Sequence, residues 1–175
     1  GVVANQPQSM AGTIDVHASQ KGAWFVGLCD RLRLPVVVLV DTPGFLPGRG
    51  QEVAGVIRHG AAFLQAFASA TVPTVTVVLR KAYGGAYIVM NAKDLGADYA
   101  FAWPGAEIAV MGARGAVSIL QRRKLAESPE LRPELEDEYK RQQCTPWPAA
   151  HGGYVDEVIE PADTRARLLE CLSEA

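Results

Sequence analysis

Residues 75–90 read Val-Thr-Val-Val-Leu-Arg-Lys-Ala-Tyr-Gly-Gly-Ala-Tyr-Ile-Val-Met, and this stretch decides the fold of the chain. Its first five residues are mostly β-branched and uncharged, which predicts a strand buried on both faces. The run after Gly84 and Gly85, to about Leu95, is compatible with a helix. Such a turn leaves backbone N–H groups at the start of a helix, where they suit a bound anion or a developing oxyanion. A tight turn that only needs a positive φ is the alternative, and this segment alone favours neither.

A second segment has the same strand-to-loop character. Residues 35–40, Pro-Val-Val-Val-Leu-Val, predict a buried strand that runs into Asp-Thr-Pro-Gly-Phe-Leu-Pro-Gly at 41–48. Two prolines and two glycines make this loop rigid and allow its backbone to approach a ligand closely. Because ligands of α/β sheets usually lie beyond the carboxyl ends of strands, we expect both loops to belong to one site.

These motifs, in this order, resemble the carboxyltransferase (β) subunits of biotin-dependent acyl-CoA carboxylases. The family pattern is D-x-P-G-F-x-P-G, Q-E, R-H-G-A, A-T-V-P, R-K-x-Y-G-G-A-Y, A-W-P-x-A-E-I-A-V-M-G and G-A-V. The corresponding residues here are 41–48, 51–52, 58–61, 70–73, 80–87, 102–112 and 115–117. The resemblance extends from Asn5 to Ile159, and the combination is highly specific although no single motif is.

Composition sets further bounds on the class of protein. The 175 residues form one domain large enough for a core, and a net charge of −2 gives no reason to expect nucleic acid or a membrane as partner. Cys29, Cys144 and Cys171 are odd in number and widely spaced, which argues against a disulfide framework or structural zinc and favours the cytoplasm. No apolar run reaches the ~20 residues of a membrane helix, and no signal peptide is found.

The first residues suggest where the domain lies in a longer protein. Gly-Val-Val-Ala-Asn at 1–5 looks like the end of a strand, with no initiator Met before it. Family members carry a preceding domain of the same fold that binds acyl-CoA. We therefore expect residues 1–175 to be the C-terminal, biotin-binding domain, excised from that preceding domain.

Hydrophobic runs predict helices and strands in alternation. We expect helices at 16–34, 51–69, 113–123, 127–143 and 163–173, and strands at 35–40, 74–79, 99–103, 107–110 and 154–159. The predicted buried faces of the first two helices are Phe25, Leu28, Cys29 and Leu32, and Val53, Val56, Ile57, Ala61, Leu64, Phe67 and Ala68. Alternation predicts an α/β fold with a mainly parallel sheet. The resemblance implies the crotonase (ClpP-like) fold, a spiral of ββα units, which alternation cannot distinguish from a doubly wound sheet.

Two later segments have a distinct composition. Residues 127–143 are rich in charge and predict an exposed helix that lies on the body with a solvated face. Residues 145–153 contain prolines and glycines and predict a loop.

Side-chain catalysts are hard to find in this sequence. His17, His59 and His151 have neither metal-ligand nor triad spacing, so we expect no metal site. No serine stands in a G-x-S-x-G setting, and Lys81 is not part of a phosphate-binding P-loop. What remains is catalysis by backbone amides, which needs no titrating side chain.

The resemblance implies a reaction for such amides. The carboxyl group of carboxybiotin passes to an acyl-CoA, acetyl-CoA or propionyl-CoA, giving malonyl-CoA or methylmalonyl-CoA. By resemblance, the amides of Gly85 and Ala86 hold the ureido oxygen of biotin as its negative charge grows, and losing one such donor typically costs ~2.7–4 kcal/mol. The preceding domain, usually of the other subunit in a dimer, holds the acyl-CoA carbonyl. Implied partners are a biotin carboxylase or biotin carrier subunit and further copies of the chain, assembled through dimers into a hexamer.

Other residues are expected to shape the site. The expected biotin-pocket residues are Gly44, Phe45, Gly84, Tyr87, Met111 and Gly112. Ile88 is a core residue or, since relatives have Asp or Ile at this position, a residue that selects the acyl group. Tyr83 and Tyr87 pack against biotin or in the core.

Two carboxylates have expected structural roles, and one segment departs from the family pattern. Asp41 is expected to cap or brace the Pro/Gly loop, and Glu107 to hydrogen-bond near the domain interface; a catalytic role is the alternative for each. Trp24 and Gly27 stand where the family usually has arginines, so any salt bridge made by those arginines is lost here.

Three other functions compete with acyl-CoA carboxylation. A biotin-dependent decarboxylase or transcarboxylase would use the same domain with another partner. A crotonase-type hydratase or isomerase would need two positioned glutamates near the glycine turn, and the sequence offers no such pair. The domain by itself can also be a non-catalytic binding and dimerisation module.

Overall fold

The computed structural model describes residues 1–174, and within them six strands form one sheet in which every pairing is parallel. The strand order is β1 (Val2–Ala4), β2 (Val36–Thr42), β3 (Thr74–Tyr83), β4 (Tyr99–Ala102) and β6 (Glu157–Val158). The remaining strand, β5 (Glu107–Ala109), pairs with the distal part of β3. Parallel neighbours joined by helices are the α/β architecture that the alternation of hydrophobic runs predicts.

Each face of the sheet carries its own hydrophobic core. Val36, Val38 and Val40 of β2 point to one face, where they meet Val26 and Phe63. Val75 and Val77 of β3 point to the other face and pack with the residues Phe101, Ile159 and Cys171. This burial on both faces explains why β2 and β3 are almost continuously β-branched.

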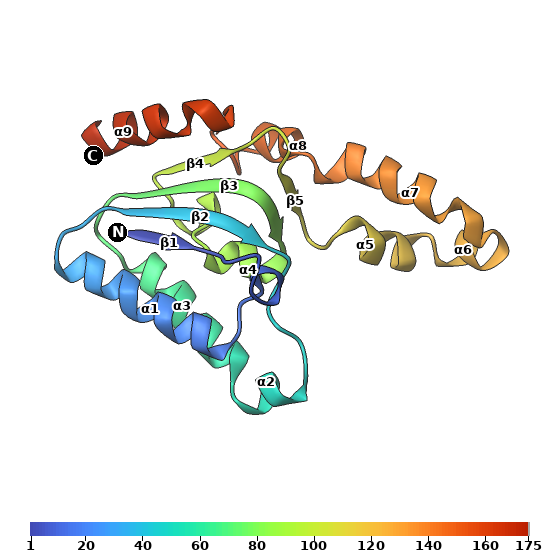
Figure 1. Cartoon of the computed structure of the whole chain (residues 1–175), viewed down its shortest axis with the longest axis horizontal. Helices are drawn as coiled ribbons and strands as arrows, with labels where there is room; N and C mark the ends of the chain where they lie inside the picture. Colours follow the sequence, from blue (N-terminus) through green and yellow to red (C-terminus); the bar gives the residue numbers. More distant parts are fainter. Residues whose placement is uncertain (175) are drawn as a thin grey trace.

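Helices cover both faces (Figure 1). The first face lies under α1 (Val16–Arg31), α3 (Val56–Ala68) and the short α4 (Gly84–Val89). The opposite face lies under α9 (Thr164–Glu174). Asp15 caps the start of helix α1, and its carboxylate accepts the Ala18 N–H at 2.7 Å. Gly22 lets α1 approach α3, because a Cβ there would lie 2.5 Å from the Phe63 ring.

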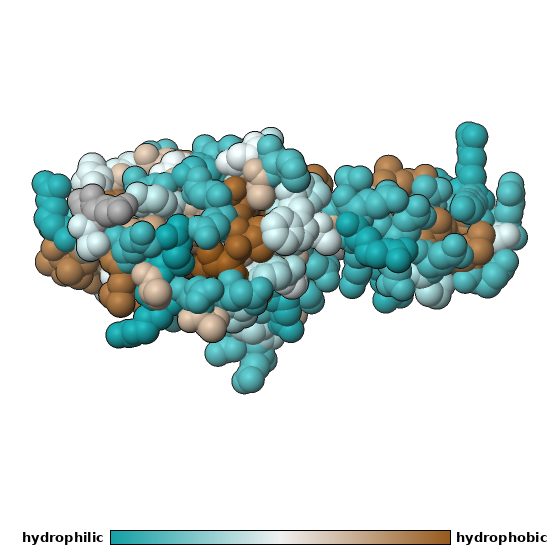
Figure 2. All heavy atoms as spheres, turned by 90° about the horizontal axis from the view of Figure 1, so that it is seen from above, coloured by the Kyte–Doolittle hydropathy of each residue, from teal (hydrophilic) through white to brown (hydrophobic). Residues whose placement is uncertain are grey.

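A helical arm projects from the far end of the sheet (Figure 1), and it stands clear of the body when seen from above (Figure 2). It consists of α5 (Ala113–Leu120), α6 (Arg122–Glu127), a 3-10 turn at Pro129–Leu131 and α7 (Arg132–Tyr139). A small core holds the arm together: Val117, Leu125 and Leu135 are buried. The chain returns through a π-helical turn at Lys140–Cys144 and α8 (Pro146–His151).

The arm corrects two expectations from the sequence. Residues 127–143 do not form one helix lying on the body, because the chain breaks at Ser128 and turns back so that Leu135 packs in the arm's core with Val117. The predicted loop at 145–153 contains α8, since Pro146 occupies a first-turn position where its missing N–H costs nothing.

Several element boundaries also differ from the prediction. The helix expected at 51–69 is split into α2 (Arg49–Val53) and α3, because Gly55 adopts a left-handed φ of 85°. Val53 and Ile57 are therefore not on a buried stripe: they are 81% and 77% exposed. The helix expected at 16–34 ends at Arg31, so Leu32 lies just beyond it and is likewise exposed. The helix after the glycine pair stops at Val89 rather than Leu95, and the last strand shrinks to two residues.

Candidate functional site

The glycine turn lies at the end of β3, which runs four residues further than predicted. There Lys81–Tyr83 leave β4 and pair with β5. Gly84 has a φ of +55°, and a Cβ on it would lie 2.9 Å from the Val110 carbonyl oxygen. Gly85 has no positive φ, and its Cβ would meet nothing nearer than the Phe45 ring at 3.8 Å. Turn geometry thus explains Gly84 but not Gly85.

The amides after the turn are available to a ligand. The first N–H groups of a helix have no acceptor within the helix. Within residues 1–174, neither the Gly85 nor the Ala86 N–H donates a hydrogen bond to a group outside α4. Because α4 has only six residues, these amides matter more than the dipole behind them.

A groove of about 400 Å³ begins at these residues and runs along β5. Its wall contains four of the predicted site residues: Gly84, Gly85, Tyr87 and Ile88. The sequence did not indicate the other members, which are Ala92, Lys93, Asp94, Ile108, Ala109, Val110 and Tyr154. Ile88 is 37% exposed, so it is not a core residue. Tyr87, in contrast, is a buried member of the main core that also reaches the groove.

The remaining predicted residues lie around the groove rather than on it. Phe45 packs behind the turn, where its ring would be 2.9 Å from a Cβ on Gly60 and 3.8 Å from one on Gly85. Gly44, at a φ of +147°, shapes the loop that carries Phe45. Met111 folds towards Gly115, and Gly112 packs on the Tyr83 ring. Ala86 is buried, and only its amide is expected to serve a ligand.

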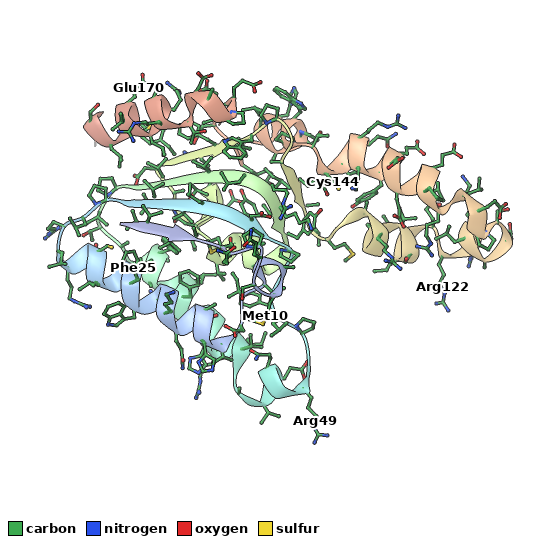
Figure 3. All side chains as sticks on the ribbon, viewed as in Figure 1. Met10, Phe25, Arg49, Arg122, Cys144 and Glu170 are labelled. Carbon is green, nitrogen blue, oxygen red and sulfur yellow. The ribbon has the colours of Figure 1, made fainter. Side chains whose placement is uncertain are left out.

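The titratable groups near the turn are tied to one another. The Tyr83 hydroxyl donates to the Glu107 carboxylate, which also pairs with Lys140 at 3.4 Å. Burial and the hydrogen bond to Glu107 raise the pKa of Tyr83. Burial and the nearby Glu107 charge also raise the pKa of Cys144. Cys144 lies where the arm joins the sheet (Figure 3). Burial raises the pKa of Tyr87 to about 12. Both tyrosines therefore keep their protons at neutral pH and do not act as bases.

Glu107 and Asp41, the two carboxylates considered from the sequence, bind different partners. Glu107 links the end of β3 to the root of the arm through Tyr83 and Lys140. The expectation that Asp41 braces the Pro/Gly loop is wrong, since its carboxylate pairs with Arg80 at 3.0 Å. The Thr42 hydroxyl instead contacts that loop, 3.4 Å from the Gly44 N–H. Among the described residues that line the groove there is no glutamate.

The model of the carboxyl transferase domain family matches residues 1–175. The chain belongs to this family. It is 57% identical to the propionyl-CoA carboxylase beta chain of Saccharopolyspora erythraea, over 98% of this chain and 33% of that protein. It is 54% identical to the methylmalonyl-CoA carboxyltransferase 12S subunit of Propionibacterium freudenreichii subsp. shermanii, over 98% and 33%.

A solved structure extends the likeness to three dimensions. The crystal structure of transcarboxylase 12S, a hexamer with methylmalonyl-CoA and methylmalonic acid bound, superimposes with a TM-score of 0.94 at 52% identity. The match covers 99% of this chain and 34% of that one. The predicted fold, crotonase-like with a parallel sheet, is confirmed, as is the resemblance to carboxyltransferase β subunits. This carboxyl transferase chain spans about a third of the length of the curated relatives it matches.

Within residues 1–174, every helix is too short or too polar to cross a bilayer.

Proposed function

We propose that this chain is the C-terminal, biotin-binding domain of a carboxyltransferase that moves a carboxyl group from carboxybiotin to acetyl-CoA or propionyl-CoA. The observation that carries the proposal is the pair of successive amides at the start of α4: Gly85 lines the groove, Ala86 follows it, and within residues 1–174 neither N–H has an acceptor outside α4. Family membership and the propionyl-CoA carboxylase and transcarboxylase relatives support it.

The groove fits biotin in size and in chemistry. At about 400 Å³ it lies within the usual range of small-molecule sites, and its walls at Ile88, Ile108 and Val110 are apolar. The two amides match a ureido oxygen, which accepts hydrogen bonds. Bound carboxybiotin would supply the carboxyl group and, on its release, a negative charge on that oxygen.

The chain's own part in the reaction is electrostatic. The Gly85 and Ala86 N–H groups would hold the ureido oxygen and stabilise its charge in the transition state, as donors in oxyanion holes do. Once biotin fills the groove, the apolar walls at Ile88, Ile108 and Val110 would lower the polarity around these hydrogen bonds and so strengthen them. Tyr87 stays protonated because burial raises its pKa to about 12, so it does not compete for a proton.

The acyl-CoA is assigned to a domain beyond these residues. The curated relatives are about three times as long, and we propose that a second domain, usually on another subunit, holds the acyl-CoA carbonyl. A biotin carboxylase or carrier subunit would deliver carboxybiotin, and dimers would assemble into a hexamer, the form found for transcarboxylase 12S. A cytoplasmic location is proposed with this function, consistent with the buried thiols of Cys29 and Cys144.

If a second domain holds the acyl-CoA, residues 1–175 alone should lack carboxylation activity, and this can be tested directly. Purified residues 1–175 are expected to fold and to show no acyl-CoA carboxylation, whereas the full-length enzyme converts acetyl-CoA or propionyl-CoA with free carboxybiotin as donor. Product formation is measured by chromatography of malonyl-CoA and methylmalonyl-CoA. Malonyl-CoA made by residues 1–175 alone would place the acyl-CoA site within this chain, and an inactive full-length enzyme would refute carboxyl transfer.

The exposed groove position of Ile88 predicts substrate preference. Ile88→Asp in the full-length enzyme is expected to shift the ratio of kcat/KM away from acetyl-CoA and towards propionyl-CoA. The direction follows from the resemblance, since Asp is typical of propionyl-CoA carboxylases at this position and Ile suggests tolerance for acetyl-CoA. A carboxylate there also carries a desolvation cost and changes the polarity of the wall. The ratio is measured with both substrates before and after substitution.

A matched control separates this effect from the added charge alone. Leu169 of α9 is exposed and remote from the groove, so Leu169→Asp should leave the ratio unchanged. An equal ratio for parent and Ile88→Asp, in a folded enzyme, would mean that Ile88 does not select the acyl group.

A second candidate function is a subunit of a transcarboxylase. It is favoured by the 54% identity to the methylmalonyl-CoA carboxyltransferase 12S subunit, close to the 57% found for the carboxylase relative. Both functions use the same amides and groove, and they differ in the partner that carries biotin. Purification of the native complex, with identification of its biotinylated subunit, distinguishes them.

A further inference from the structure

An irregularity in the sheet lies just before the glycine turn. Val40 of β2 pairs with Val78 of β3, and Thr42 pairs with Ala82. Asp41 is thus the single residue on β2 that faces three on β3: Leu79, Arg80 and Lys81. Such a bulge leaves backbone groups outside the ladder, bends the strand and is frequent next to active sites.

The Asp41 carboxylate fills this gap. One oxygen accepts the Lys81 N–H at 3.3 Å, and the guanidinium of Arg80 binds the carboxylate through Nε and Nη2 at 3.0–3.3 Å. On its own strand, the Asp41 N–H donates to the Asn5 side chain at 3.0 Å. Asp41 is 7% exposed, so replacing it would leave the partly buried Lys81 N–H without its acceptor and release the Arg80 side chain, which is 57% exposed, to solvent.

The bulge sets the direction in which β3 continues. Before it, β3 pairs with β4 from Val75 to Val78; after it, Lys81–Tyr83 pair with β5. Figure 1 shows β3 curving away at this end. Gly84 and Gly85 follow at once, so the bend decides where the two amides lie relative to Ile108–Val110 on the opposite wall of the groove.

We propose that Asp41 is a positioning residue for the Gly85 and Ala86 amides: by holding the bulge at Arg80 and Lys81, it fixes the direction in which β3 delivers the glycine turn. The role in catalysis rests on the proposed carboxyl transfer. Asp41 itself does not touch the groove, and a misplacement of about 1 Å at reacting groups is enough to lower a rate about 100-fold.

Asp98, which precedes β4, provides a matched control because its carboxylate also accepts a backbone N–H of β3. Its carboxylate accepts the Thr74 N–H at 2.7 Å, at the opposite end of β3 from the turn. Asp98→Ala therefore removes a carboxylate–amide bond of the same kind without affecting the bulge. It should cost stability but leave the groove unchanged.

Kinetics of the full-length enzyme and NMR of residues 1–175 test the proposal together. Asp41→Ala should lower kcat about 10- to 100-fold, with KM for biotin within about threefold of the parent. It should also shift the ¹H–¹⁵N resonances of Gly85 and Ala86, whereas Asp98→Ala changes neither. Asp41→Asn retains an oxygen for the Lys81 N–H, so its loss of kcat should be smaller; it carries the test if Asp41→Ala does not fold.

Two results would overturn the inference. One is a folded Asp41 variant with kcat within about threefold of the parent; the other is unchanged Gly85 and Ala86 resonances in that variant. If the parent enzyme shows no carboxyl transfer, the proposed function fails, while the resonances still decide whether Asp41 positions the turn.

Discussion

Gly85→Val should lower carboxyl transfer by the full-length enzyme at least about 100-fold while the protein stays folded, because loss of one oxyanion donor typically costs about 10²–10³ in kcat. Gly85 has no positive φ, and a Cβ there would be 3.8 Å from its nearest contact, the Phe45 ring. The turn therefore tolerates a side chain, but the branched methyl groups would crowd the space beside the two amides. The measurement is transfer with free biotin, together with thermal unfolding.

Two variants control this result. Gly85→Ala adds only the Cβ that fits, so its loss of activity should be smaller. Gly105→Val introduces the same side chain at a glycine that has nothing within 4 Å and lies outside the groove, and it should leave transfer unchanged. Activity of Gly85→Val within about threefold of the parent would refute the role of the amide.

Gly84→Ala should damage the fold itself. A residue held at a left-handed φ costs on the order of 1–3 kcal/mol, and here the Cβ would also lie 2.9 Å from the Val110 carbonyl oxygen. Backbone is hard to displace, so the strand β5 would have to move, and with it one wall of the groove. Urea unfolding measures the lost stability, and transfer by the full-length enzyme should fall as well.

Gly153→Ala isolates the contribution of the backbone conformation. Gly153 has a φ of +78° and nothing within 4 Å of an added Cβ, so alanine there introduces backbone strain without a steric clash. Gly84→Ala should therefore cost more free energy of unfolding than Gly153→Ala. Equal costs would show that the contact with Val110 is relieved without consequence.

The sequence by itself was sufficient for the main strands, the glycine turn and the family. Buried parallel strands need uninterrupted β-branched runs, and the runs at 35–40 and 74–79 lie within β2 and β3 apart from Pro35. Four of the predicted site residues share one groove, because the turn places Gly84, Gly85, Tyr87 and Ile88 within five positions of one another. The strands and the turn are local features, so β-propensity predicts the strands and motif spacing locates the turn. The family follows from the resemblance of the motifs.

Only the tertiary structure decided which glycine serves the turn and what surrounds it. Val110 makes Gly84 the strained position, and it lies in the segment that follows the short strand β5, whose pairing with β3 no local pattern reveals. Asp41 meets Arg80 and Lys81 across 39 and 40 positions of sequence, and it stabilises a bulge that periodicity does not show. The helical arm likewise follows from the burial of Leu135 with Val117 rather than from the charges on its surface. Such contacts join residues far apart in the chain, and their geometry exists only once the sheet has formed.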